Sequence, residues 1–91
     1  MSFTLEYTGS FRKDLKKAAK RGLNIELIST AIKLLETTGH LPTNYKPHKL
    51  VSNYKGYWEC HIQPDWLLIW NIDTKEKIIR LIRTGTHSDL F

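Results

Sequence analysis

The chain has 91 residues, of which 41% are hydrophobic and 25% are charged, a composition typical of one folded globular domain. Its 14 basic and 9 acidic residues give a net charge of +5, which favours polyanions or acidic proteins as partners. The sequence has no pattern typical of a secretory signal or a membrane span, and its single cysteine excludes an internal disulfide. We therefore expect one domain over residues 1–91, located in the reducing cytoplasm and not associated with a membrane.

The first part of the chain predicts a strand followed by a helical hairpin. Residues 3–7 alternate between apolar and polar side chains, as a half-buried strand does. Ser10 is placed to cap a first helix that ends near Gly22. Asn24 is placed to cap a second helix, which carries a broad apolar stripe and ends at Gly39. The outer face of the first helix is basic and carries Arg12, Lys13, Lys16, Lys17 and Lys20.

The remaining sequence predicts a loop and three strands. Two prolines within residues 40–47 exclude a regular helix and leave a loop that leads to His48. Strands are predicted at 57–62, 66–72 and 77–84, and the short connections between them imply an antiparallel meander. Continuous apolar runs in the last two strands indicate strands covered on both faces or nearly so, with helices on at least one side. The predicted fold is α+β, in the order β-α-α-β-β-β, with the helical hairpin packed against a small sheet.

Three of the four histidines lie at the ends of predicted elements, beside turns. They are His48, His61 and His87. Imidazole is the side chain best suited to proton transfer near neutral pH, and the ends of elements can converge at one end of a sheet. Alternation along the strand places Cys60 toward the helices and His61 on the open face. The three histidines are therefore candidate catalytic residues, although a lone histidine is more often structural or merely exposed.

Other polar and aromatic residues close to these positions have more than one interpretation each. Arg80 and Arg83 interrupt an otherwise apolar strand, and each is placed to hold a phosphate, to snorkel at the strand end or to pair with Glu59. Asp65 follows a proline and is either a turn former or a partner that orients a histidine. Trp66 and Phe91 either pack within the protein or stack on an unpaired base. The residue types alone do not decide between these roles.

Metal binding is a competing use of histidine and cysteine. Cys60 and His61 are adjacent in a predicted strand, so they point to opposite faces and cannot share one ion without distortion. The sequence has neither C-x-x-C nor H-E-x-x-H spacing, no glycine-rich phosphate loop and no serine in a nucleophile elbow. We therefore expect a site that uses neither a metal nor another cofactor.

Three stretches of the sequence resemble a known family. The runs are HKL at 48–50, YKGYWECHIQPDWLLIW at 54–70 and RTGTHSDLF at 83–91, and they resemble the YafQ branch of the RelE/ParE toxin superfamily. The early helices match that family only in their order and basic character. The sequence departs from the family's pattern at Trp58, where arginine is frequent, and this removes one potential phosphate contact.

This resemblance implies the toxin of a type II toxin-antitoxin system. Such a toxin is an endoribonuclease that cleaves messenger RNA in the ribosomal A site without a metal, and it is held inactive by an acidic antitoxin of the DinJ type. A toxin that enters the A site is expected to be a small monomer. The resemblance assigns base or phosphate binding to Trp66, Arg83 and Phe91. It assigns the proton transfers to His48, His61, Asp65 and His87, without saying which is the acid and which the base.

Two other functions share these sequence features in part. A ParE-like toxin has the same superfamily fold and inhibits DNA gyrase by binding, and a third possibility is a non-catalytic module that binds RNA or protein. Fold alone does not separate these functions. A gyrase inhibitor has no need of three histidines at element ends together with Asp65 and Arg83. A binding module needs the basic helix and the aromatic residues, but not the histidines.

Overall fold

The structure is a computed structural model, and it describes residues 2–51 and 54–91. Its elements in chain order are β1 (Thr4–Tyr7), α1 (Gly9–Lys20), α2 (Ile25–Thr38), a 3-10 turn (Thr43–Tyr45), β2 (His48–Lys49), β3 (Trp58–Gln63), β4 (Trp66–Asp73), β5 (Ile78–Gly85) and α3 (His87–Leu90). The predicted α+β order is confirmed, and β2 and α3 are short elements that were not predicted. Among the helices of these residues, none has the length and apolar character needed to cross a bilayer.

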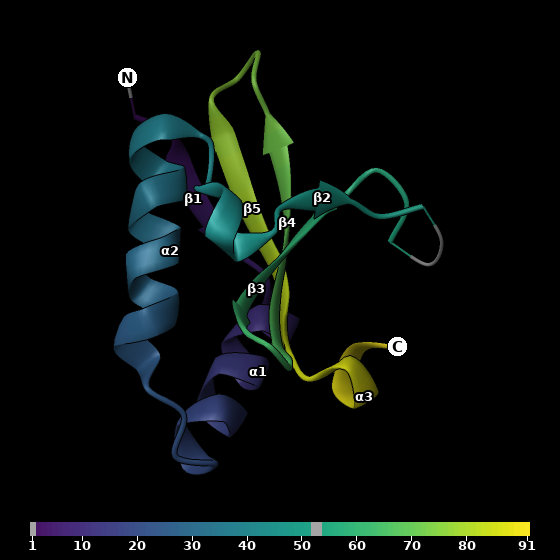
Figure 1. The fold of residues 1–91 in the computed structure, drawn as a ribbon. Coiled ribbons are helices and arrows are strands. Elements are labelled where there is room, and N and C mark those ends of the chain that lie inside the picture. The colour runs from purple at the N-terminus through teal and green to yellow at the C-terminus, as the bar shows by residue number, and fades with distance from the viewer. Residues whose placement is uncertain (1, 52–53) are drawn as a thin grey trace.

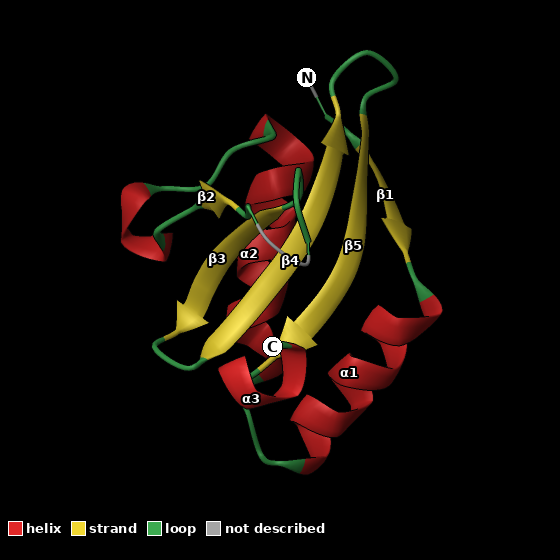
Figure 2. Ribbon diagram, turned by 90° about the vertical axis from the view of Figure 1, so that its right-hand side faces the viewer, coloured by secondary structure: helices red, strands yellow, loops and turns green. Residues whose placement is uncertain are grey.

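The strands form one mixed sheet in the order β1-β5-β4-β3-β2, which Figure 2 shows face on. The pairs β2–β3, β3–β4 and β4–β5 are antiparallel, so the predicted meander is confirmed. β1 lies parallel to β5 at one edge. The first and last strands of the chain are therefore neighbours, and β5 lies between β1 and β4.

Side-chain caps determine where the two long helices begin. The Thr8 hydroxyl accepts a hydrogen bond from the backbone N–H of Phe11 at 2.9 Å, so the predicted cap at Ser10 is wrong. The same hydroxyl donates to the carbonyl of Ile82 at 2.8 Å, which ties the start of α1 to β5. Asn24 caps α2 as predicted, because its side chain accepts a backbone N–H of the first turn.

Helices α1 and α2 cover one face of the sheet, while α3 lies on the opposite side (Figure 1). Cys60 faces the helices, as alternation predicted, and burial raises the pKa of its thiol to about 12. On the opposite face Leu90 of α3 packs with Leu67 and Ile69 of β4. The main core between helices and sheet includes Phe11, Ala18, Ile28, Ala31, Leu35, Cys60, Trp66, Leu68, Trp70, Ile79 and Leu81.

The end of α2 generates a stability prediction. Gly39 has φ 77°, and a Cβ there would lie 2.7 Å from Cε1 of Phe3. Gly22 has a similar φ of 83°, but a Cβ there would meet nothing within 4 Å. We predict that both glycine-to-alanine changes lower the free energy of unfolding by about 1–2 kcal/mol for the left-handed backbone, and that Gly39→Ala loses about 1 kcal/mol more through the Phe3 contact.

Urea denaturation of the two variants measures this difference. Gly22→Ala is the matched control, because it changes the backbone preference without adding a steric contact. Equal losses in the two variants would show that the Phe3 ring moves aside at no cost.

Candidate active site

The three element-end histidines lie together on the open face of the sheet. The ring centroids of His48 and His61 are 6.5 Å apart, and those of His61 and His87 are 5.9 Å apart. His61 belongs to β3, His48 comes from the edge strand β2, and His87 begins α3 just after β5. His40 lies elsewhere, beside a cavity lined in part by Trp70. The structure thus brings together the histidines that the sequence singled out.

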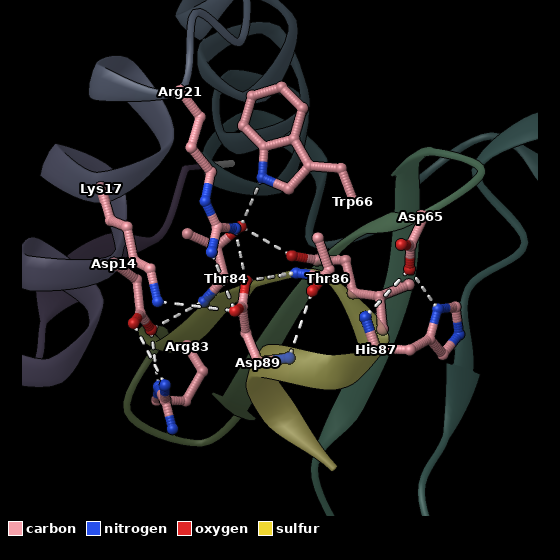
Figure 3. Close-up of polar contacts among 11 residues, drawn as sticks. Asp14, Lys17, Arg21, Asp65, Trp66, Arg83, Thr84, Thr86, His87 and Asp89 are labelled. Carbon is pink, nitrogen blue, oxygen red and sulfur yellow. Dashed lines mark hydrogen bonds and ion pairs between the residues drawn. The ribbon is translucent and has the colours of Figure 1, made fainter.

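Asp65 holds His87 through two hydrogen bonds (Figure 3). Its Oδ1 accepts the backbone N–H of His87 at 2.9 Å and faces the ring Nδ1 at 2.6 Å. These bonds, the backbone one foremost, hold the pKa of Asp65 below its usual value, so the carboxylate is ionised at neutral pH. Because Nδ1 faces a carboxylate it carries a proton, and Nε2 of His87 is the nitrogen left for proton exchange.

The other two histidines differ in how their ring nitrogens are engaged. His61 has its Nδ1 3.1 Å from the carbonyl oxygen of Pro64, so Nε2 is again the nitrogen left for exchange. His48 is engaged at both positions: Nδ1 lies 2.9 Å from the carbonyl oxygen of Lys46, and Nε2 lies 3.2 Å from Oε1 of Glu59. Glu59 was not predicted as a site residue. Strand alternation offered the signal, because it places Glu59 on the same face as His61.

Arg83 is fixed by a carboxylate of α1. Asp14 accepts two hydrogen bonds from its guanidinium, at 2.6 Å from Nε and 3.1 Å from Nη2, and this pairing raises the pKa of Arg83. The alternative prediction that Arg83 pairs with Glu59 is therefore wrong, because Glu59 faces His48. Nη1 of Arg83 lies 3.5 Å from the Tyr54 hydroxyl, and the side chain stays partly exposed. The pair with Asp14 orients the cation and leaves it able to meet a phosphate.

The two aromatic candidates occupy different environments. Trp66 is 2% exposed and belongs to the core, where its Nε1–H donates to the Thr84 hydroxyl at 2.9 Å. This burial supports a packing role for Trp66, and its contact with a base stays a prediction. Phe91 is 51% exposed, and its ring lies edge-on to Tyr54 at 5.6 Å between centroids. Phe91 and Tyr54 form the aromatic surface near the histidines, and Tyr54 was not predicted.

Asp89 has no predicted role, yet it positions the C-terminal helix (Figure 3). Its carboxylate accepts two hydrogen bonds from Arg21, at 2.7 and 3.1 Å, and lies 3.5 Å from Nζ of Lys17. It also forms a reciprocal capping box with Thr86. Arg21 foremost, then Thr86, holds the pKa of Asp89 well below its usual range. The spacing T-x-x-D at residues 86–89 was the signal in the sequence for this capping box. The carboxylate also lies close to Gly85, where a Cβ would be only 2.9 Å from Oδ2 of Asp89.

The histidines lie on an open surface. A shallow hollow of about 270 Å³ borders them and is lined in part by Lys46, His61 and Pro64. A larger cavity, of about 560 Å³, is lined in part by His40 and Trp70 and includes none of the three clustered histidines. Within residues 2–51 and 54–91, no three histidine, cysteine or acidic side chains are arranged to hold a metal ion. The geometry suits acid–base chemistry on an extended, anionic molecule.

Comparison with known proteins gives the relatives of the chain. A family described as "Bacterial toxin of type II toxin-antitoxin system, YafQ" matches residues 3–91. The mRNA interferase toxin YafQ of Escherichia coli (strain B / BL21-DE3) is 43% identical over 88 residues, which cover 96% of this chain and 94% of that protein. The crystal structure of YafQ from E. coli strain BL21(DE3) superposes with a TM-score of 0.90, at 41% identity and 98% coverage of both chains. YafQ in the E. coli DinJ-YafQ complex gives a TM-score of 0.89 at 38% identity, covering 100% of this chain and 99% of that one.

The fold and the family match are those of a bacterial toxin of the type II toxin-antitoxin class. Within that class, the chain belongs to the YafQ family. The match extends through the early helices, which from sequence resembled the family only in order and basic character.

The Asp89 contacts generate a prediction about stability and pH. We expect Asp89→Asn to lower the free energy of unfolding by about 1–2 kcal/mol at neutral pH. Because the pKa of Asp89 is lowered by folding, its contribution is complete above the unfolded carboxyl pKa of about 3.9. That contribution is lost as the pH falls through the lower pKa of the folded state.

Denaturation curves of Asp89→Asn and the parent protein, taken at pH 7 and at several values below pH 4, test this expectation. The difference in unfolding free energy should shrink on acidification. Ser88→Ala, on the adjacent residue of α3, is the control and should show no such trend. A difference in unfolding free energy that stays constant with pH would show that the charge of Asp89 is not its cause.

Proposed function

We propose that this protein is an mRNA interferase, the endoribonuclease toxin of a type II toxin-antitoxin system. Membership of the YafQ family and the identity to a relative named mRNA interferase toxin support this function. The observation that carries it is the grouping of His48, His61 and His87 on one open face, with Asp65 bonded to His87. We further propose that it acts as one domain over residues 1–91 in the cytoplasm, where messenger RNA is translated.

The proposed reaction is attack of a ribose 2′-hydroxyl on the adjacent phosphodiester. A base removes the 2′-hydroxyl proton, the new O–P bond forms while the bond to the 5′-oxygen breaks, and an acid protonates the departing 5′-oxygen. Arg83 offsets the negative charge that develops at the phosphate, and Phe91 provides a ring for base stacking. These groups supply the proton transfers and the charge, so we propose a metal-independent reaction. The transfers are shared by His48, His61, Asp65 and His87.

The proposed substrate is messenger RNA in the ribosomal A site, as the family resemblance implies. The described part of the protein measures 35 × 28 × 27 Å, so a monomer is small enough to enter a confined site on the ribosome. Its charge of +5 favours approach to an RNA-rich surface. The open face lets a strand lie across the histidines without threading into a cavity.

We propose an acidic antitoxin of the DinJ type as the regulatory partner. A structural relative is a complex of YafQ with DinJ, which supports the existence of such a partner. The outer face of α1 offers the complementary charge, and its exposed cations are Arg12, Lys13, Lys16, Lys17 and Lys20. An acidic segment that folds on this helix can bind by charge complementarity.

Cleavage of ribosome-bound messenger RNA in a purified translation system tests the function. We expect His87→Ala to reduce cleavage by about 10²–10⁴-fold and to abolish growth arrest on induction. Its thermal unfolding should stay close to that of the parent, because the His87 side chain is exposed. His40→Ala removes a histidine outside the cluster and should retain full activity. Undiminished cleavage by His87→Ala would exclude His87 from the mechanism.

The same purified protein should be assayed for inhibition of gyrase-dependent DNA supercoiling. Intact message together with blocked supercoiling would replace the ribonuclease with a ParE-like function. If the protein neither cleaves message nor inhibits supercoiling, the remaining function is that of a non-catalytic binding module. Cleavage with normal supercoiling is the expected result.

The antitoxin proposal predicts salt-dependent binding. We expect the combined change of Lys13, Lys16 and Lys20 to glutamine to weaken binding to the cognate antitoxin by about tenfold or more at low salt, and to flatten its dependence on ionic strength. The same number of changes at Lys33, Lys46 and Lys75, which lie off α1, is the control. Salt-independent binding by the unchanged protein would show that charge is not what α1 contributes.

A further inference from the structure

We propose that Lys46 binds the phosphate of the nucleotide next to the scissile one, in the shallow hollow that borders the histidines. This inference deepens the proposed ribonuclease function and rests on it. It gives the segment between α2 and β2 a role in holding RNA, where the family resemblance assigns no residue.

The hollow lies along the open edge of β3. In the described part of the chain, β2 pairs only with Trp58 and Glu59 of that strand, so the edge beyond them faces the 3-10 turn instead. The hollow has a volume of about 270 Å³ and is lined by Asn44, Lys46, His61, Ile62, Gln63 and Pro64. Because His61 belongs both to the histidine cluster and to this lining, a strand whose scissile phosphate lies at the histidines reaches the hollow with its next nucleotide.

The backbone of Lys46 has a conformation that lysine rarely adopts. Its φ is 52°, in the left-handed region that glycine and asparagine enter at lower cost. Its N–H donates to the carbonyl of Thr43 at 2.9 Å, and its carbonyl oxygen lies 2.9 Å from Nδ1 of His48. Any residue type supplies these two backbone contacts. A strained backbone beside a candidate site is a sign of function, and the reason for a lysine here lies in its side chain.

The ammonium group of Lys46 is available to an anion. The residue is exposed, and within residues 2–51 and 54–91 neither a carboxylate nor an aromatic ring engages its side chain. Lys77 also has a left-handed backbone, with φ 59°, but its Nζ lies 5.0 Å from the centroid of the Phe3 ring. The side chain of Lys77 therefore has a partner inside the protein, whereas that of Lys46 is left for a ligand of negative charge.

A second hollow, on the other side of Asp65, offers no comparable cation. It has a volume of about 400 Å³ and is lined in part by Arg21, Asp65 and Trp66. The guanidinium of Arg21 is already bonded to the carboxylate of Asp89, at 2.7 and 3.1 Å, so its charge is offset. The carboxylate of Asp65 would repel a phosphate there. The path of the strand away from the histidines is therefore more favourable over Lys46.

Binding to ribosomes that carry an uncleavable message tests the contact. The A-site codon of this message has 2′-methoxy groups, which remove the attacking hydroxyl, and a shortened message that ends before the A site serves for comparison. Lys46→Asn suits the left-handed backbone and removes the charge. We expect it to weaken binding to the full message by about tenfold at low salt, and to lower the slope of log Kd against log salt by about 0.7, the share of one single-strand phosphate. Binding to the shortened message should not change.

Two further variants serve as the matched controls. Lys46→Arg keeps the charge and should bind as the parent does. Lys77→Asn removes the other left-handed lysine, in the turn between β4 and β5 at the opposite end of the sheet from α3 (Figure 1), and should leave binding unchanged. Equal binding of the full message by Lys46→Asn and the parent overturns the proposal. An equal loss on both messages also overturns it, because Lys46 would then contact ribosomal RNA.

Cleavage kinetics separate this role from support of the neighbouring histidine. Lys46 does not touch the reacting atoms, so we expect Lys46→Asn to raise KM by about tenfold and to leave kcat close to that of the parent. A fall in kcat with an unchanged KM would make Lys46 a support for His48 and overturn the proposal. Because asparagine relieves the left-handed strain, the thermal unfolding midpoint of Lys46→Asn should not fall. If this variant does not fold, Lys46→Gly is the second neutral variant, with the same expected results.

The two measurements also separate this inference from the proposed function. If the unchanged protein cleaves no message, the proposed ribonuclease fails, and binding to the 2′-methoxy message still decides the role of Lys46. If the unchanged protein does not bind the full message better than the shortened one, both are overturned.

Discussion

Two carboxylates, one near the start of the chain and one near its end, join the first helix to the C-terminal end of the protein. Asp14 in α1 binds Arg83 in β5 and also accepts the backbone N–H of Thr84 at 3.1 Å. Asp89 in α3 binds Arg21 at the end of α1. Because α3 begins at His87, the position of the His87 ring depends on these pairs as well as on its own contact with Asp65. The basic helix α1 is therefore part of the scaffold of the candidate site as well as the proposed surface for the antitoxin.

The parts of the fold that were predictable from sequence follow from periodicity and from local chemistry. Alternation placed Cys60 and His61 on opposite faces, and Asn24 and Gly39 have the residue types expected at a helix cap and a left-handed helix end. The first cap was misplaced because Ser10 and Thr8 are both good capping residues only two positions apart. β2 and α3 have two and four residues, too few to show any period. Tertiary contacts, which the pattern does not contain, stabilise them.

The candidate site was predictable as a set of histidines, but their partners were not. The pair of Arg83 with Asp14 spans 69 residues of sequence, and no local pattern reports such a contact. Trp66 stands beside Asp65 and so suggested a surface role, but the Thr84 hydroxyl gives its indole N–H a partner inside the core. Burial, and not proximity in sequence, decided its environment. The hydrogen-bonding partners of the three histidine rings are backbone carbonyls and carboxylates, which only the folded chain brings close.

The parallel pairing of β1 with β5 has a consequence for how the protein folds during its synthesis. A strand made of residues 4–7 must wait until residues 78–81 have been synthesised before it has this neighbour, and β4 also needs β5 to complete its pairing. Contacts of such long sequence separation close a large loop and form late. A nascent chain that stops before β5 would lack the complete sheet together with Arg83 of β5 and His87 of α3. A premature stop before β5 therefore removes these candidate site residues at the same time as it leaves the sheet incomplete.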